Sequence, residues 1–236
     1  MNTIFKNYFF YLWKEAATYN NSILASHIEP QEKARILDIG SDSGELITQR
    51  VQNVKKPEIY GIDLRKEASN KSKKISIKAL VGNVEDGLPF KSSFFDIVSA
   101  NQIIEHLRDL DFFLEEIHRV LKPQGYLILS TENLSSWHNI LALCLGWQAF
   151  SQHVSSYRSI GNPLSIGHNT DYKSGTMHIK ILTPRGLREL AKLHNFKIEE
   201  FFGAGYYPLP SFLSKCLSRL DPTHSAFIGI KARKMK

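Results

Sequence analysis

The sequence predicts an α/β fold in which helices cover both faces of a mostly parallel sheet. Strand-like and helix-like segments alternate from residue 35 to about 131, and parallel strands need crossover connections of this kind. The segment YLILST at 126–131 is almost entirely apolar, as a strand buried on both faces should be. Two strand-like segments at 197–203 and 225–234 complete a doubly wound sheet with an antiparallel terminal strand.

The earlier strands are runs of apolar and β-branched residues bounded by turn residues. In chain order we expect them at 34–40, 57–64, the start of 77–90, and 94–100. A short helix is expected at 45–52, because Ile47 and Val51 share one helical face. The lysine-rich segment 66–74 is predicted to be a polar helix or a loop.

The strongest helical signal lies at 111–125, DFFLEEIHRVLKPQG. Its apolar residues recur at the spacing of one helical face: Phe113, Ile117, Val120 and Leu121. Asp111 is the expected N-cap, and Pro123 with Gly125 is expected to end the helix.

A second clear helix is predicted at 183–196, TPRGLRELAKLHNF. Thr183 is a suitable N-cap, and Pro184 suits the first helical turn because the missing N–H has no partner there. One face of this helix carries Leu187, Leu190, Ala191 and His194.

We predict a single domain over residues 1–236 with two additions to the sheet. The aromatic-rich residues 1–30 are expected to form a helical cap. The segment 133–182, which is rich in histidine, glycine and tryptophan, breaks the alternation and is longer than a connection needs to be. We expect it to contain a helix at 135–146 and to form an insertion that covers the active site.

Charge and cysteine content limit the partners and the location. The net charge of +7 permits a polyanionic partner but does not require one. Cys144 and Cys216 lie far apart and show neither a disulfide framework nor a zinc spacing, which is typical of a reducing, cytoplasmic location. No apolar run is long enough to span a bilayer, although the segment WHNILALCLGW at 137–147 could contact a membrane surface.

The first strand ends in the turn D-I-G-S-D-S-G, from Asp38 to Gly44. In an open parallel sheet the first strand-to-helix turn is the usual nucleotide site. The turn is not G-x-G-x-x-G, and the acid that precedes Gly40 would repel a pyrophosphate. The same acid would favour a cation, such as the amino group of a methionine moiety.

The next two strands end in side chains that suit an adenosine. Asp63 ends the second strand, where an acid can accept both ribose hydroxyls. Asn83 follows the third strand, where its amide can pair with the adenine edge. An adenosine with an aminocarboxylate and no phosphates is S-adenosylmethionine.

The chain resembles the class I S-adenosylmethionine-dependent methyltransferases of the small-molecule type, and is similar to the ubiquinone-biosynthesis O-methyltransferases. The resemblance covers 34–131, through ILDIGSDSG, YGIDL, VGNVEDGLPF, FDIVSANQIIEHL and FFLEEIHRVLKPQGYLILSTEN, and continues more loosely through 177–198. It implies a Rossmann-like methyltransferase fold with a seven-stranded sheet, and S-adenosyl-L-methionine as the cofactor.

The resemblance also implies positions for the cofactor ligands. Asp38, Gly40, Ser41 and Gly44 would hold the methionine end, Asp63 the ribose, Leu64 the adenine face, Asn83 and Val84 the adenine edge, and Asn101 with Gln102 the methyl-bearing centre. Asp42 stands where the family usually has glycine. Aspartate tolerates positive φ better than most residues, so binding is expected to survive but to weaken.

Transfer of the methyl group to an oxygen can need a base near the acceptor proton. His106 and His178 are the candidates, with a structural histidine as the alternative for each. Glu132 is expected to cap the next helix rather than to bind substrate. No metal site is predicted, because the nine histidines show no paired spacing.

Three functional classes remain open at this point. The favoured one is a methyltransferase acting on a small-molecule, lipid or glycan acceptor. A tRNA or protein methyltransferase is suggested by the charge, but the loop after the fourth strand reads SANQ rather than N-P-P-[YF]. A nucleoside-binding protein without catalysis is suggested by Asp42. The acceptor and the oligomeric state do not follow from the sequence.

Overall fold

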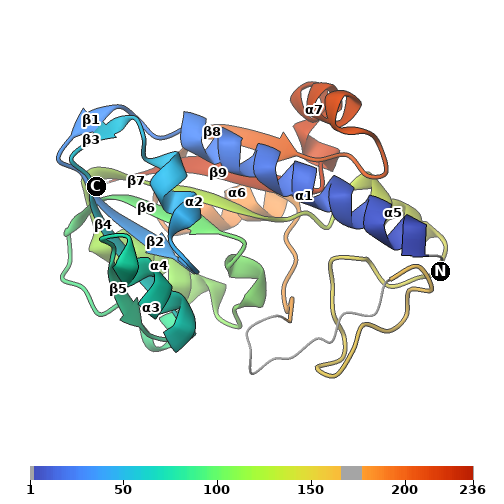
Figure 1. Cartoon of the computed structure of the whole chain (residues 1–236), viewed down its shortest axis with the longest axis horizontal. Coiled ribbons are helices and arrows are strands. Elements are labelled where there is room, and N and C mark those ends of the chain that lie inside the picture. The colour runs from blue at the N-terminus through green and yellow to red at the C-terminus, as the bar shows by residue number, and fades with distance from the viewer. Residues whose placement is uncertain (1–2, 166–176, 236) are drawn as a thin grey trace.

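The computed structural model describes residues 3–165 and 177–235. Its centre is a seven-stranded sheet in the order β5-β4-β2-β6-β7-β9-β8 (Figure 1). The strands are β2 (Arg35–Ile39), β4 (Glu58–Asp63), β5 (Lys78–Val81), β6 (Phe95–Asn101), β7 (Leu121–Glu132), β8 (Phe196–Ala204) and β9 (Phe227–Lys234). Strand β9 runs antiparallel to both of its neighbours, and the pairs from β5 to β7 are parallel. The predicted fold class is therefore confirmed.

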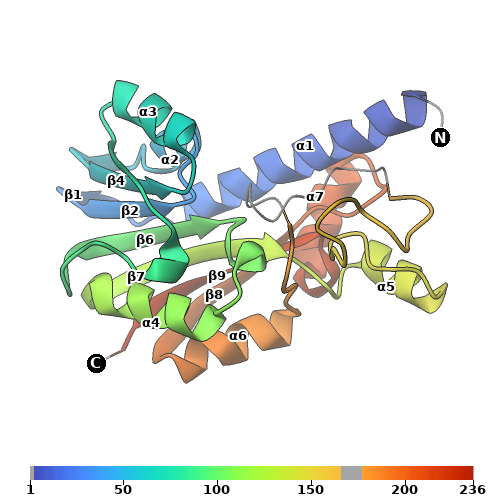
Figure 2. The same cartoon turned by 90° about the horizontal axis from the view of Figure 1, so that it is seen from below.

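Helices lie on both faces of this sheet (Figure 2). Helix α1 (Thr3–Ser26) and α2 (Glu45–Arg50) cover one face, and α4 (Leu110–Val120) and α6 (Pro184–Leu193) cover the other. The α4 and α6 face holds the larger apolar core, in which the predicted residues Phe113, Ile117 and Leu187 are buried. Helix α3 (Lys66–Lys74) packs beside β4 and β5. Among the described residues, no helix is both long and apolar enough to cross a bilayer.

The ends of α4 differ from the prediction. The N-cap is Asp109, whose side chain accepts a hydrogen bond from the Phe112 N–H, whereas Asp111 lies in the first turn. The helix ends at Val120, and β7 begins at the next residue. Pro123 and Gly125 lie within β7, at a place where its pairing with β6 is irregular: Phe95 pairs with Leu121, but Ile97 pairs with Tyr126. The predicted cap of α6 is confirmed, because Thr183 accepts from the Gly186 N–H.

Several elements were not predicted. Helix α7 (Ser211–Leu220) follows β8, and β1 (Gln31–Glu32) pairs with β3 (Val54–Lys55) in a small second sheet. Short 3-10 turns occur as η1 (Val84–Asp86), η2 (Ile104–His106) and η3 (Pro222–His224). Within 133–182, the structure describes the predicted helix as α5 (Trp137–Cys144). Residues 166–176 of that predicted cover lie outside the described residues.

Candidate active site

The candidate residues converge because their strands are parallel. Strands β2, β4, β5 and β6 all end at the same edge of the sheet. Asp63 is the last residue of β4, and Asn101 is the last residue of β6. Gly40 is the first residue after β2, and Asn83 is the second residue after β5. This edge is where open α/β sheets bind their ligands.

The Gly40–Gly44 turn needs glycine for two different reasons. Both glycines have positive φ, at 72° and 79°. A Cβ at Gly44 would lie 2.4 Å from the Cδ1 of Ile77, so side-chain packing by itself excludes larger residues there. Asp42 also has a positive φ of 42°, which confirms that aspartate adopts the conformation. The buried Ser41 Oγ has no hydrogen-bond partner among the described residues.

Asp63 is buried, and its carboxylate is already surrounded by donors. Its Oδ2 accepts from the Asp42 N–H at 3.0 Å, and its Oδ1 accepts from the Arg65 N–H at 2.9 Å and Nε at 3.1 Å. The Arg65 Nη2 adds a contact to Oδ2 at 3.3 Å and bonds the Asp42 carboxylate at 3.1 Å. Four N–H groups therefore occupy the acceptor positions of this carboxylate. Leu64, beside it, is half exposed.

Asn83 is held by a local contact. Its Oδ1 accepts from the Glu85 N–H at 3.1 Å and caps η1, so this lone pair is in use and the Nδ2 amide is the group that can reach a ligand. Val84 is buried in the main core. The backbone of this loop, rather than the Val84 side chain, is therefore available at the edge.

Asn101 and Gln102 connect the edge to helix α1. The Asn101 Oδ1 accepts from the Asn20 Nδ2 at 3.0 Å, and Ser130 donates to the Asn20 Oδ1 at 2.9 Å. Gln102 has a φ of 54°, and its buried Nε2 has no partner among the described residues. A strained backbone beside an unpaired donor is frequent at ligand sites. No sequence motif indicates these Asn20 contacts.

Asp38 already has a charged partner within the protein. Its Oδ1 lies 3.4 Å from the Arg50 Nη1, and both side chains are buried. Arg50 in turn bonds Ser99 and Asn21, which ties β2, β6 and α1 together through α2. Burial raises the pKa of Asp38, while the Arg50 charge opposes this rise. This carboxylate therefore has a counter-charge within the protein, and its contact with the methionine end of the cofactor stays a prediction.

The two candidate histidines lie together. The ring centroids of His106 and His178 are 4.8 Å apart, although the residues come from η2 and from the end of the predicted cover. The His106 Nδ1 lies 3.0 Å from the Met177 carbonyl, and the His178 Nδ1 lies 2.7 Å from the Ser151 carbonyl. A carbonyl only accepts, so each Nδ1 carries a hydrogen, and each neutral ring presents its Nε2 lone pair.

Two buried carboxyl groups adjoin this pair. Glu105 accepts from the Thr131 hydroxyl at 2.9 Å, while its Oε1 has no partner among the described residues. Glu132 accepts from the Ser151 hydroxyl at 2.8 Å. Helix α5 is preceded by Ser136 at its N-cap, so the prediction that Glu132 caps it is wrong. Burial raises the pKa of Glu105 to about 8 and that of Glu132 to about 7.

Glu105, His106 and His178 form a group that linear spacing could not reveal. Their potential ligand atoms all lie within 4.8 Å of one another, which is close enough for one cation. The Glu105 carbonyl also accepts from the Ile179 N–H at 2.7 Å, which fixes the chain that carries His178. Burial lowers the pKa of His106 to about 4, and the neighbouring His178 adds to this effect. The imidazole is therefore neutral near pH 7.

Glu105→Gln is expected to flatten the pH dependence of stability between pH 6.5 and 8. The folded state retains the Glu105 proton up to a pKa of about 8, whereas the unfolded chain loses it near the ordinary value. Stability therefore falls as pH rises through this window, by up to about 1.4 kcal/mol per pH unit for one proton. Denaturant unfolding at each pH measures the slope. Glu58→Gln, an exposed control, should keep the wild-type slope; an unchanged slope in Glu105→Gln would contradict the assignment.

The fold and this edge define a class: a Rossmann-like α/β domain with polar side chains at the carboxyl ends of its parallel strands and a buried acid–histidine cluster. Residues 12–200 match the sequence profile of the family described as methyltransferase domain. The chain belongs to this family, as a class I S-adenosylmethionine-dependent methyltransferase. S-adenosylmethionine is accordingly its cofactor.

Named relatives agree with this assignment. The ubiquinone biosynthesis O-methyltransferase of Bartonella bacilliformis is 29% identical over 119 residues, covering 50% of this chain and 41% of that protein. The mitochondrial one of Rattus norvegicus is 24% identical over 195 residues, covering 78% and 50%. The chain thus spans half or less of the length of these relatives.

Solved structures show the same fold. The S-adenosylmethionine-dependent methyltransferase of Mesorhizobium loti superposes with a TM-score of 0.61 at 14% identity, covering 90% of this chain and 96% of that one. One from Methanosarcina mazei gives 0.62 at 19% identity, covering 90% and 97%. The cyclase SpnF gives 0.62 at 16% identity, covering 94% and 82%. Because a cyclase shares it, the fold by itself does not define the reaction.

Proposed function

We propose that the protein transfers a methyl group from S-adenosylmethionine to a hydroxyl of a small-molecule, lipid or glycan acceptor, in the cytoplasm. The observation that carries this proposal is the pair of neutral His106 and His178 rings, which lie together with the buried Glu105 carboxyl group near the carboxyl edge of the sheet. A hydroxyl acceptor has a proton to lose, and an imidazole lone pair is suited to take it.

The residues of the edge fit the cofactor. In this proposal the Asp63 carboxylate binds the ribose hydroxyls, the Asn83 amide binds the adenine edge, and the backbone of the Gly40–Gly44 turn binds the methionine end. The unpaired Ser41 Oγ and Gln102 Nε2 offer further polar contacts. Arg65 is the basic residue bonded to this carboxylate, and it already pairs with acids, so the donor set suits hydroxyl and amino groups better than phosphates.

The chain's own contribution to the reaction is alignment, proton removal and exclusion of water. When bound, S-adenosylmethionine supplies an activated methyl group on a sulfonium centre. Positioning an acceptor hydroxyl in line with that methyl is worth several kcal/mol. His106 or His178 takes the hydroxyl proton at Nε2, and the Met177 and Ser151 carbonyls stabilise the resulting imidazolium at Nδ1.

We further propose that residues 1–30 and 133–182 cover this site. Two contacts support it: Asn20 of α1 bonds Asn101 at the edge, and the backbone of Ile179 bonds Glu105. A cover of this kind would keep water, a competing hydroxylic acceptor, away from the methyl group.

Acceptor screening tests the proposed function. Purified protein and labelled S-adenosylmethionine are incubated with catechols, hexose derivatives, a protein mixture and tRNA, and label transfer is followed. We expect an alkali-stable methyl ether on a hydroxyl acceptor. Transfer to tRNA with a steep salt dependence would favour the nucleic-acid alternative instead, which the net charge of +7 suggests. Cofactor binding without transfer to any class would favour a non-catalytic protein.

Arg65→Ala is expected to tighten S-adenosylhomocysteine binding by up to about 5-fold. The ribose hydroxyls must displace the Arg65 guanidinium from Asp63. The Arg65 side chain is 53% exposed, and an ion pair with such a solvated partner is worth about 0.2–1 kcal/mol. Calorimetric titration measures the change. Arg35→Ala removes an exposed arginine that pairs with Glu58 at the opposite end of β4, and should leave affinity unchanged. Weaker binding in Arg65→Ala would mean that Arg65 itself contacts the ligand.

A further inference from the structure

Helix α7 buries polar residues and exposes apolar ones, which is the opposite of a usual surface helix. It packs Ser214 and Ser218 against the protein, where the Ser214 hydroxyl accepts from the Tyr206 N–H and the Ser218 hydroxyl donates to the Ser214 carbonyl. Its outer side carries Phe212 and Leu220, which are 72% and 76% exposed. A surface helix normally buries its apolar side, so this outer side is suited to an apolar environment.

The neighbouring helices show the same feature. Helix α5 buries Asn139 and exposes Trp137 and Leu141. The first half of α1 exposes five large aromatic side chains: Tyr8, Phe9, Phe10, Tyr11 and Trp13. Exposed apolar residues scattered singly need no explanation, but a contiguous group of this size marks an interaction site.

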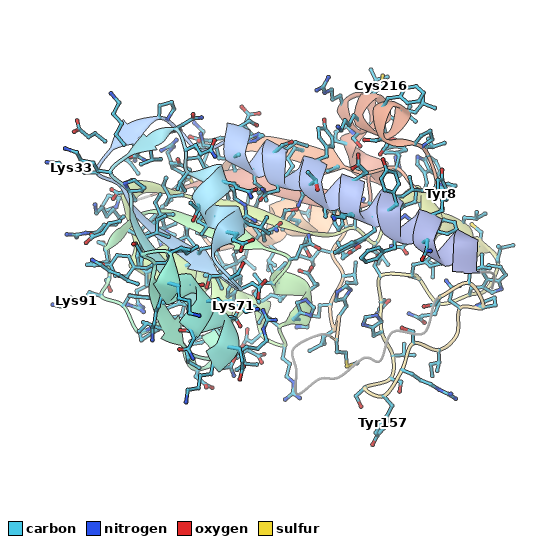
Figure 3. The ribbon with its side chains drawn as sticks, viewed as in Figure 1. Tyr8, Lys33, Lys71, Lys91, Tyr157 and Cys216 are labelled. Carbon is cyan, nitrogen blue, oxygen red and sulfur yellow. The ribbon has the colours of Figure 1, made fainter. Side chains whose placement is uncertain are left out.

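The helices that carry these exposed residues approach the two ends of α7, and we call the exposed residues together the docking face. Tyr8 of α1 donates to the Pro208 carbonyl at 3.4 Å, just before α7 begins. The Trp137 ring of α5 stacks on His224 of η3 with centroids 4.5 Å apart, just after α7 ends. In Figure 3, Tyr8 and Cys216 of α7 project from the same end of the molecule, whereas Lys71 of α3 projects elsewhere.

The charged residues of α7 and α5 are of one sign. Helix α7 contains Lys215 and Arg219 and no acidic residue, and α5 contains no charged residue. The Lys215 Nζ lies 5.6 Å from the centre of the Tyr19 ring, and the Arg219 Nε lies 3.3 Å from its hydroxyl. The basic stripe therefore runs along the α1 side of the apolar stripe. A two-fold contact between copies would bring these like charges together, whereas an anionic lipid surface attracts them.

We propose that the docking face binds the surface of an anionic lipid bilayer. The apolar side chains of α7 enter the boundary between headgroups and acyl chains, and Lys215 with Arg219 contacts lipid phosphates. Aromatic rings next to basic residues are the composition of helices that lie in this interface. The inference rests on the surface alone, and is independent of the acceptor.

Co-sedimentation with vesicles tests the proposal. We expect the wild-type protein to bind vesicles that contain phosphatidylglycerol and to bind pure phosphatidylcholine vesicles far more weakly. Lys215→Ser with Arg219→Ser should weaken binding to the anionic vesicles roughly 30-fold. Phe212→Ser with Leu220→Ser should weaken it at least about 10-fold. Circular dichroism confirms that the variants are folded.

Lys71→Ser with Lys74→Ser is the matched control, because it removes the same charge from α3. It should bind anionic vesicles nearly as well as the wild type. If this control loses as much vesicle binding as Lys215→Ser with Arg219→Ser, the attraction depends on net charge alone and the proposal is overturned. Equal binding of the wild-type protein to the two kinds of vesicle would also overturn it. If the wild-type protein is a dimer that does not bind vesicles, and Phe212→Ser with Leu220→Ser makes it a monomer, the docking face serves self-association instead.

Discussion

Asp63→Ala should weaken S-adenosylhomocysteine binding by about 2–4 kcal/mol, or roughly 30- to 1000-fold. The carboxylate is buried at the end of β4 and is the group we place against the ribose hydroxyls. Its removal takes away one or two charge-assisted hydrogen bonds, each worth about 1.5–3 kcal/mol. Calorimetry measures the affinity directly, without a known acceptor.

The control for this experiment is at the other end of the same strand. Glu58→Ala removes a half-exposed carboxylate that pairs with Arg35 and Lys78, so it should leave the affinity unchanged. A thermal melt separates loss of the ligand contact from loss of fold, since Asp63 also holds the Asp42 and Arg65 N–H groups. An affinity for Asp63→Ala within twofold of wild type would remove Asp63 from the ribose site.

Replacing both His106 and His178 with alanine should lower the rate of methyl transfer by roughly 10²- to 10⁴-fold, the usual contribution of a general base. The affinity for S-adenosylhomocysteine should change little, because neither ring is placed against the cofactor. Wild-type activity should fall as pH falls through the His106 pKa of about 4, since protonation removes the Nε2 lone pair. Initial rates across pH, with the acceptor found by screening, measure the loss of rate and its pH dependence. Calorimetry measures the affinity for S-adenosylhomocysteine.

His194→Ala is the matched control, because its imidazole pairs with Asp111 on the α4 and α6 side of the sheet. It should keep nearly the full rate. Full activity in the double variant would exclude a histidine base. Loss of wild-type activity with a chelator, restored by a divalent cation, would assign Glu105, His106 and His178 to a metal site and contradict direct proton transfer.

The sheet and its main helices could be predicted because their signals are local. The apolar spacing of α4 predicts the buried face that the structure shows, with Phe113 and Ile117 in the core. The Thr183 cap of α6 is set by residues three positions apart. Helix α7 could not be predicted in this way, because its apolar residues face outward and its buried side carries serines.

The site could be predicted strand by strand, but its contacts could not. The ends of β4 and β5 identify Asp63 and Asn83 by position alone. The Asp38–Arg50 pair, the Asn20–Asn101 bond and the Glu105–His106–His178 group each join different elements, and no linear spacing reveals them. The turn at Gly44 is predictable from the sequence and its positive φ confirms it, but the Ile77 side chain that packs against it is not predictable from spacing.

The central claim is that the edge formed by β2, β4 and β5 seats the nucleoside and amino acid ends of S-adenosylmethionine. Calorimetric titration of the wild-type protein with S-adenosylhomocysteine and, separately, with NAD tests it most directly. The account predicts saturable binding of S-adenosylhomocysteine with one site per chain and no detectable binding of NAD. Tight binding of NAD with no signal from S-adenosylhomocysteine would contradict it.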